Sequence, residues 1–275
     1  MFERRRIILI SLGLLILALT GCVASYIYYP ERDIRFTPNS VGLAYTNVTL
    51  ETSDGVNINA WWVPVKNPRA IVLFCHGNGG NVGYYLETLQ VFNRLGLSAL
   101  IFDYRGYGRS GGSPSEKGTY LDAEAAWSYL TQARKIAPRQ IIFWGRSLGG
   151  AIAARTAAGH RCGLLILESA FTSVPEVAQA HIAWLPAWVL ARYRYETSRF
   201  LKRVTVPTLV IHSPDDEIIP YSLGQKLFET LEGPKAFLEI KGSHNQGFID
   251  SLSVYEAGVD AFIKQYARPK ELLSP

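Results

Sequence analysis

A serine between two glycines is the feature of this sequence that points most directly to chemistry. Residues 145–149 read Gly-Arg-Ser-Leu-Gly, directly after an apolar run and directly before a helical pattern. Such a strand-to-helix turn holds a serine in a strained conformation with its hydroxyl exposed, and the glycines leave room where side chains would clash. We therefore predict that Ser147 is a nucleophile and that the N–H of Leu148 stabilises a developing oxyanion. We expect Arg146 to form a structural ion pair rather than to bind an acidic ligand group.

A serine hydroxyl needs a base that takes its proton. His244 follows a strand pattern and a glycine, in the last loop before the final helical pattern. We predict that His244 is the base. We expect His212 to pack or cap at the end of a strand, and His160 and His181 to be solvated.

The base needs an acid that fixes its tautomer and stabilises the imidazolium. Asp215 and Asp216 both lie in the loop after the strand pattern at 208–212, and Glu168 ends another strand pattern. These residues alone leave three candidates for the acid.

Five stretches resemble, in the same order, those of the α/β-hydrolase superfamily. They are Phe-Cys-His-Gly-Asn-Gly-Gly at 74–80, Asp-Tyr-Arg-Gly-Tyr-Gly-Arg-Ser at 103–110, the serine motif at 145–149, His-Ser-Pro-Asp-Asp-Glu-Ile-Ile-Pro at 212–220 and Gly-Ser-His-Asn at 242–245. The resemblance covers residues 45–268. Within the superfamily the chain is similar to serine-aminopeptidase-like and depalmitoylating α/β-hydrolase-domain proteins, which are often membrane-anchored.

The resemblance implies roles for several residues that spacing alone leaves open. The family's chain order Ser…Asp…His places the base at His244. The family pattern Asp-Glu/Asp-x-x-Pro fits the chain from Asp216, which makes Asp216 the acid and Asp215 a turn residue. By the same resemblance the second oxyanion donor is the N–H of Asn78, with Gly79 as the alternative, and His76 supports that loop. The resemblance implies no metal or organic cofactor.

Apolar runs and helical patterns alternate along the chain from about residue 46, which predicts an α/β fold. The expected strands cover 46–50, 58–63, 70–75, 98–102, 140–144, 164–167, 208–212 and 236–240. The expected helices cover 83–94, 120–135, 148–158, 223–230 and 248–266. We predict a mostly parallel eight-stranded sheet with helices on both faces and its two leading strands antiparallel at one edge. An aromatic segment at about 170–205 is predicted to form a small helical cap.

Residues 1–29 are predicted to be a targeting or anchoring segment, and residues 30–275 the hydrolase domain. A basic cluster precedes an apolar stretch at 7–24, which is just long enough to cross a bilayer. The stretch contains Leu-Thr-Gly-Cys at 19–22, which resembles a bacterial lipobox and makes Cys22 a lipidation candidate. A lipoprotein signal is the preferred interpretation, with an uncleaved membrane helix or a buried core helix as alternatives. Both membrane interpretations place the catalytic domain outside the cytoplasm.

Composition narrows the classes of function further. The net charge of +5 is too small and too scattered to indicate nucleic acid binding. Three cysteines without close spacing indicate neither a disulfide framework nor a metal site. The sequence thus predicts a membrane-tethered serine hydrolase of carboxylic esters or thioesters, acting on acylated or lipid-like substrates. A peptidase or amidase, an acyltransferase and a non-catalytic interaction module are the alternatives, and nothing indicates an oligomeric state.

Overall fold

The structure is a computed structural model that describes residues 27–182 and 193–266. Its main sheet has eight strands in the order β10-β9-β8-β7-β4-β6-β3-β2. β2 pairs antiparallel with β3, and β3 pairs antiparallel with β6, whereas the other neighbours are parallel. The bounds are β2 Thr46–Glu51, β3 Asn57–Val63, β4 Ala70–Cys75, β6 Leu97–Phe102, β7 Ile141–Arg146, β8 Leu164–Glu168, β9 Thr208–His212 and β10 Lys235–Glu239. The predicted mostly parallel sheet with an antiparallel edge is confirmed.

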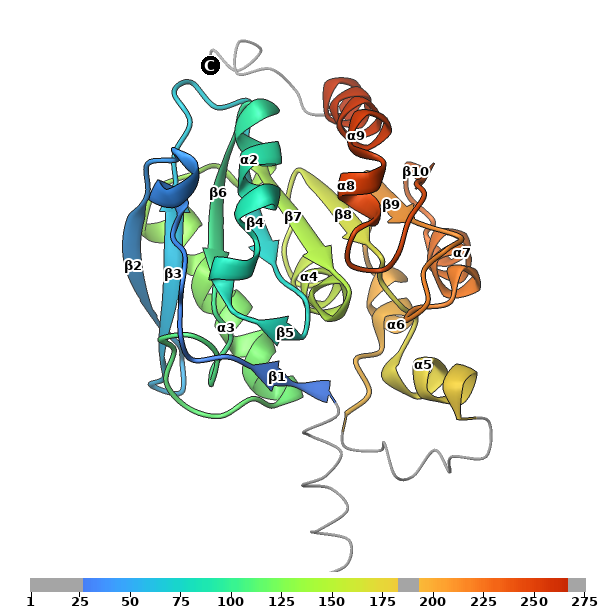
Figure 1. Cartoon of the computed structure of the whole chain (residues 1–275), viewed down its shortest axis with the longest axis horizontal. Helices are drawn as coiled ribbons and strands as arrows, with labels where there is room; N and C mark the ends of the chain where they lie inside the picture. The colour runs from blue at the N-terminus through green and yellow to red at the C-terminus, as the bar shows by residue number, and fades with distance from the viewer. Residues whose placement is uncertain (1–26, 183–192, 267–275) are drawn as a thin grey trace, which may run out of the picture.

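Helices cover both faces of this sheet (Figure 1). The bounds are α2 Leu86–Arg94, α3 Glu116–Ser128, α4 Leu148–Ala157, α5 Val174–His181, α6 Thr197–Leu201, α7 Tyr221–Thr230, α8 Gly247–Asp250 and α9 Leu252–Tyr266. Short 3-10 turns lie at Pro38–Val41, Val82–Tyr84 and Pro138–Gln140, and a π-helical turn at Tyr129–Ala133 extends α3. One apolar cluster lies between the sheet and α3, α4, α6 and α7, and the other between the sheet and α2 and α9.

Strand β7 shows why the sequence forms a sheet that is covered on both faces. Ile141 and Phe143 belong to one apolar cluster, whereas Ile142 and Trp144 belong to the other. Successive side chains of a strand point to opposite faces, so a continuous apolar run buries both. β7 therefore lies in the middle of the molecule, and the residue that follows it is held on a rigid support.

The observed helices differ from the predicted ones at their ends. The helix expected over 83–94 begins at Leu86, and the helix expected over 223–230 begins at Tyr221. The helix expected from residue 120 begins at Glu116, because the Ser115 side chain caps it by accepting a hydrogen bond from Gly118 N at 3.1 Å. The helix expected over 248–266 is divided at Ser251 into α8 and α9.

A second, two-stranded sheet lies in a segment that the sequence analysis did not assign to a strand. β1 (Tyr29–Pro30) pairs in parallel with β5 (Gly79–Gly80), with Tyr29 opposite Gly79. Figure 1 shows this pair at one end of the main sheet, below β4 and β6. The chain that follows the predicted anchor is thus bound to the hydrolase domain from its first described residues.

Two short helices, α5 and α6, lie between β8 and β9, where the sequence predicts a cap. Trp184, Pro186 and Trp188 of the predicted cap lie outside the described residues. The predicted anchor and Cys22 also lie outside them. Across 27–182 and 193–266, no helix combines the length and apolar character needed to cross a bilayer.

Candidate active site

Ser147 lies on a tight turn between β7 and α4, as predicted. Its backbone has φ 53° and ψ −120°, a strained conformation for a residue with a side chain. Its N–H donates to the carbonyl of Glu168 at 2.8 Å, which fixes the turn to the neighbouring strand β8. A Cβ added to Gly145 would collide with the backbone of Gly149, and one added to Gly149 would collide with the carbonyl of Cys75. Both glycines are therefore required by the close approach of α4 to the sheet.

The loop at residues 76–80 lies beside this turn. A Cβ added to Gly77 would be 3.8 Å from Ser147 Cβ and 3.9 Å from the carbonyl oxygen of Arg146. Leu148 is the first residue of α4, so its N–H has no acceptor within the helix and is available to an anion. The loop and the start of α4 thus meet at the serine, the arrangement that an oxyanion site requires.

Hydrogen bonds orient the peptides of the 76–80 loop. The Gly77 N–H donates to Tyr85 Oη at 2.9 Å, so this N–H is already used. The Asn78 carbonyl accepts from Tyr29 N at 3.0 Å and from Tyr107 Oη at 2.7 Å. The Asn78 side chain donates to the carbonyl of Ile27 at 3.1 Å. Among the described residues, the Asn78 N–H has no hydrogen-bond acceptor.

His76, the first residue of this loop, has a fully buried side chain. Its Nδ1 lies 2.7 Å from the Gly77 carbonyl oxygen, which can only accept, so Nδ1 carries the proton. The ring packs against Tyr104 with centroids 4.3 Å apart, and Tyr104 Oη donates to the His76 carbonyl at 2.7 Å. Burial lowers the pKa of His76 to about 4. His76 is therefore neutral at physiological pH and supports the loop from below.

Asp216 is a buried carboxylate that accepts four polar contacts. Its Oδ1 accepts the N–H groups of Ile218 at 3.0 Å and Ile219 at 2.7 Å. Its Oδ2 lies 2.7 Å from His244 Nδ1 and 3.3 Å from His212 Nε2. Burial alone would raise the pKa of Asp216, but the hydrogen bonds from His212 and His244 outweigh it and hold that pKa well below its ordinary value. Asp216 is thus ionised at neutral pH.

His244 occupies the loop between β10 and α8. Its backbone N–H donates to Glu217 Oε2 at 3.0 Å, and its side chain is only 7% exposed. Because Asp216 Oδ2 is an acceptor, His244 Nδ1 carries the proton, which leaves Nε2 free to accept another. Ser147, Asp216 and His244 follow the carboxyl ends of β7, β9 and β10, the edge of a parallel sheet at which ligands bind.

The other candidates for the acid lie in different surroundings. Asp215 is exposed, and its Oδ2 accepts Gly242 N at 3.3 Å. Glu168 is buried, and its carboxylate contacts Arg146 Nε at 2.7 Å and accepts Tyr255 Oη at 2.7 Å. The expected ion pair of Arg146 is therefore present, and neither Asp215 nor Glu168 contacts His244.

Sequence reasoning missed one residue next to the acid. His212 was expected only to pack or cap, but its buried Nε2 faces both Asp216 Oδ2 and the Ile219 carbonyl oxygen, 3.0 Å away. Its position four residues before Asp216 is the only signal in the sequence that could have indicated this contact.

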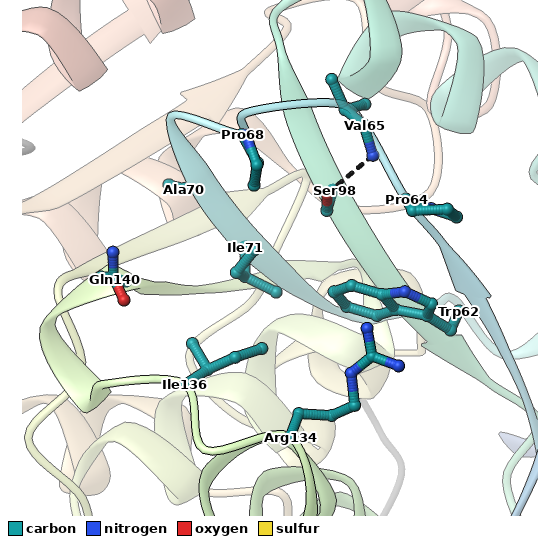
Figure 2. A pocket seen from close by; sticks show the side chains of 10 residues that line it. All are labelled: Trp62, Pro64, Val65, Pro68, Ala70, Ile71, Ser98, Arg134, Ile136 and Gln140. Carbon is teal, nitrogen blue, oxygen red and sulfur yellow. Dashed lines mark hydrogen bonds between the residues drawn. The ribbon is translucent and has the colours of Figure 1, made fainter. Parts of the chain in front are cut away.

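A cavity of about 310 Å³ lies at the end of the sheet that is formed by the amino ends of its parallel strands, opposite to the end that carries Ser147. Figure 2 shows Trp62 beneath Pro64 and Val65, with the Arg134 guanidinium beside the indole. The guanidinium carbon is 4.3 Å from the ring centroid. Ala70 and Ser98, near the amino ends of β4 and β6, also line this cavity, so it is separate from Ser147.

Comparisons with known proteins agree with this architecture. Residues 66–200 match the family model described as serine aminopeptidase, S33. The chain is 37% identical over 221 residues to the uncharacterized membrane protein YNL320W of Saccharomyces cerevisiae, covering 78% of each chain. It is 29% identical over 236 residues to the lysophosphatidylserine lipase ABHD12 of Danio rerio, covering 70% of this chain and 60% of the relative.

A solved structure shares the fold at lower sequence identity. The esterase Pf2001 of Pyrococcus furiosus superposes with a TM-score of 0.73 at 19% identity, covering 88% of this chain and 98% of that one. At such identity the likeness concerns the arrangement of strands and helices.

Proposed function

Because the chain belongs to the α/β-hydrolase superfamily, we propose that it hydrolyses carboxylic esters or thioesters through an acyl-enzyme on Ser147. The observation that carries the proposal is the 2.7 Å contact between His244 Nδ1 and the ionised Asp216. This contact selects the tautomer whose Nε2 can accept a proton. The strained turn at Ser147, on the same edge of the sheet, supports the same assignment.

The proposed reaction has two steps. Ser147 Oγ attacks the carbonyl carbon of the substrate while His244 Nε2 takes the hydroxyl proton, and Asp216 stabilises the imidazolium. The Leu148 and Asn78 N–H groups bind the oxyanion. Collapse of the intermediate breaks the bond to the alcohol or thiol, which receives the proton from His244. Water then attacks the acyl-enzyme and gives a proton to His244. As the bond between the acyl group and Ser147 Oγ breaks, His244 returns the proton to Oγ and the carboxylic acid leaves.

The position of the N-terminal segment supports the proposal that the substrates are acylated and lipid-like. Only two residues separate Ala24, the last residue of the apolar stretch, from Ile27, which is hydrogen-bonded to Asn78. The three Cα–Cα steps from Ala24 to Ile27 span at most about 11 Å. A membrane anchor at 7–24 would therefore hold the Ser147 side of the domain close to the lipid surface. A lipase and a membrane protein among the relatives favour the same assignment. The basic cluster before the apolar stretch is the reason to propose that the domain lies outside the cytoplasm.

The test is hydrolysis by the full-length protein of matched ester, thioester and amide substrates with acyl chains of increasing length. We expect ester and thioester cleavage that rises with acyl-chain length. Ser147→Ala and His244→Ala should each lower kcat by about 10³-fold or more. Equal rates on short and long chains would overturn the lipid-like substrate, and full activity of Ser147→Ala would overturn the mechanism.

A further inference from the structure

Residues 27–31, which we call the strap, run along the 76–80 loop and pair with it. Tyr29 N donates to the Asn78 carbonyl and Glu31 N donates to the Gly80 carbonyl, both at 3.0 Å. In the opposite direction, the Asn78 side chain donates to the carbonyl of Ile27 at 3.1 Å. Three hydrogen bonds thus join a segment at the start of the domain to a loop some fifty residues later.

The strap is itself fixed on its far side. Tyr28 is buried, and its Oη lies 2.7 Å from Tyr195 Oη, which in turn is 3.0 Å from Thr119 Oγ1. The Tyr28 ring also packs edge-on against Tyr193, with centroids 5.8 Å apart. Downstream, the Glu31 carbonyl accepts Gly108 N at 2.9 Å. The strap therefore has a rigid support and is not an exposed end lying on the surface.

His76 and the strap together orient the two candidate oxyanion donors. The Asn78 N–H belongs to the peptide whose carbonyl, that of Gly77, is held by His76. The Gly79 N–H belongs to the next peptide, whose carbonyl, that of Asn78, is held by Tyr29 N and Tyr107 Oη. Planar peptides couple each N–H to its carbonyl, so holding the Asn78 residue at both its carbonyl and its side chain restrains the loop beside Ser147.

We propose that the strap is a positioning element of the active site, which holds the 76–80 loop in the conformation that binds the oxyanion. Its acting groups are the Tyr29 N–H and the Ile27 carbonyl, and neither contacts the substrate. The inference rests on the proposed hydrolase function. Oxyanion donors act by being preorganised, and loss of one donor lowers kcat by about 10²- to 10³-fold. Loss of one positioning bond should lower kcat by roughly tenfold.

Tyr29 offers a matched pair of variants for the test. Tyr29 is 52% exposed, and Tyr29→Ala shortens its side chain but keeps the backbone N–H. Tyr29→Pro also removes the N–H that donates to the Asn78 carbonyl. Full-length variants would be compared by kcat and KM on para-nitrophenyl butyrate. They would also be compared by Ki for a trifluoromethyl ketone, whose tetrahedral hemiketal adduct with Ser147 carries the oxyanion.

We expect Tyr29→Pro to lower kcat by about tenfold at unchanged KM and to raise the Ki of the ketone by a similar factor, since both report oxyanion binding. Tyr29→Ala should match the parent. If Ser147→Ala is inactive, parental kcat and Ki in Tyr29→Pro would overturn the proposal that the strap positions the 76–80 loop. Parental activity in Ser147→Ala would instead overturn the proposed function.

If Tyr29→Pro does not fold, Asn78→Ala tests whether the strap positions the 76–80 loop. This variant removes the side-chain bond to the Ile27 carbonyl and keeps the Asn78 peptide N–H. We expect the same joint change in kcat and Ki, again at unchanged KM. Parental values of both would overturn the proposal.

Discussion

Replacement of Asp216 by asparagine tests the assigned acid, because the surroundings dictate how the new amide must lie. The Oδ1 position faces the N–H groups of Ile218 and Ile219, so the amide oxygen has to occupy it. The amide NH2 then faces His244 Nδ1, which in the parent donates to Oδ2. His244 must give up the proton on Nδ1 to accept from the amide, and the remaining proton moves to Nε2. In that tautomer His244 cannot act as the base for Ser147.

Two contributions set the size of the effect. To act as the base, His244 must again carry its proton on Nδ1, where it faces the amide NH2. This loses the buried hydrogen bond between the amide and Nδ1 and costs about 2 kcal/mol. The imidazolium formed during attack also loses a carboxylate partner, worth about 4 kcal/mol at an effective dielectric constant near 20. Together they raise the barrier by about 6 kcal/mol, which corresponds to a fall in kcat of roughly 10⁴-fold.

Steady-state hydrolysis of para-nitrophenyl butyrate by full-length Asp216→Asn would measure this effect, with circular dichroism to verify folding. Asp215→Asn is the matched control, because Asp215 is the exposed neighbour in the same loop and should keep parental kcat. A folded Asp216→Asn variant within about tenfold of the parent would refute the assignment of the acid.

Two further predictions concern buried histidines. His212→Phe should lower kcat by roughly tenfold at unchanged KM, because Asp216 loses one of its donors while an aromatic ring still fills the position. Parental kcat would show that His212 does not orient the acid. Burial lowers the pKa of His76 to about 4, below the ordinary value near 6.5, so its contribution to stability is fully present above pH 6.5 and is lost as the pH falls toward 4. The free energy of unfolding, measured with urea, should fall by about 3 kcal/mol between pH 6.5 and pH 4 in the parent, and by much less in His76→Gln. An equal fall in both proteins would contradict the statement that His76 is buried in its neutral form.

The central features of the fold follow from local signals in the sequence. The strand at 141–146 is a continuous apolar run, and the glycines on either side of Ser147 mark a turn that no bulkier residue allows. These signals are short-range, so the sheet, its antiparallel edge and the turn at Ser147 could all be predicted. The family's chain order predicted His244 as the base, and the family pattern Asp-Glu/Asp-x-x-Pro predicted Asp216 as the acid.

Other features depend on contacts between distant residues. β1 and β5 are two residues long each, too short for any periodic pattern, and Tyr29 is fifty positions from its partner Gly79. The role of His212 has only a weak signal, its position four residues before Asp216, because a histidine at the end of a strand has the same local pattern whether it packs or contacts a carboxylate. Ser115, which caps α3, was overlooked because the glycine and threonine at 118–119 weaken the helical pattern.

The central claim, that Ser147 is an activated nucleophile, is tested most directly by mass spectrometry after reaction with a fluorophosphonate. Trypsin should release residues 147–155, Ser-Leu-Gly-Gly-Ala-Ile-Ala-Ala-Arg, in which Ser147 is the only hydroxyl side chain. We predict a stoichiometric phosphonyl adduct on this peptide in the parent, and greatly slowed formation in His244→Ala. An adduct on a different peptide, or none in a folded protein that hydrolyses esters, would contradict the account.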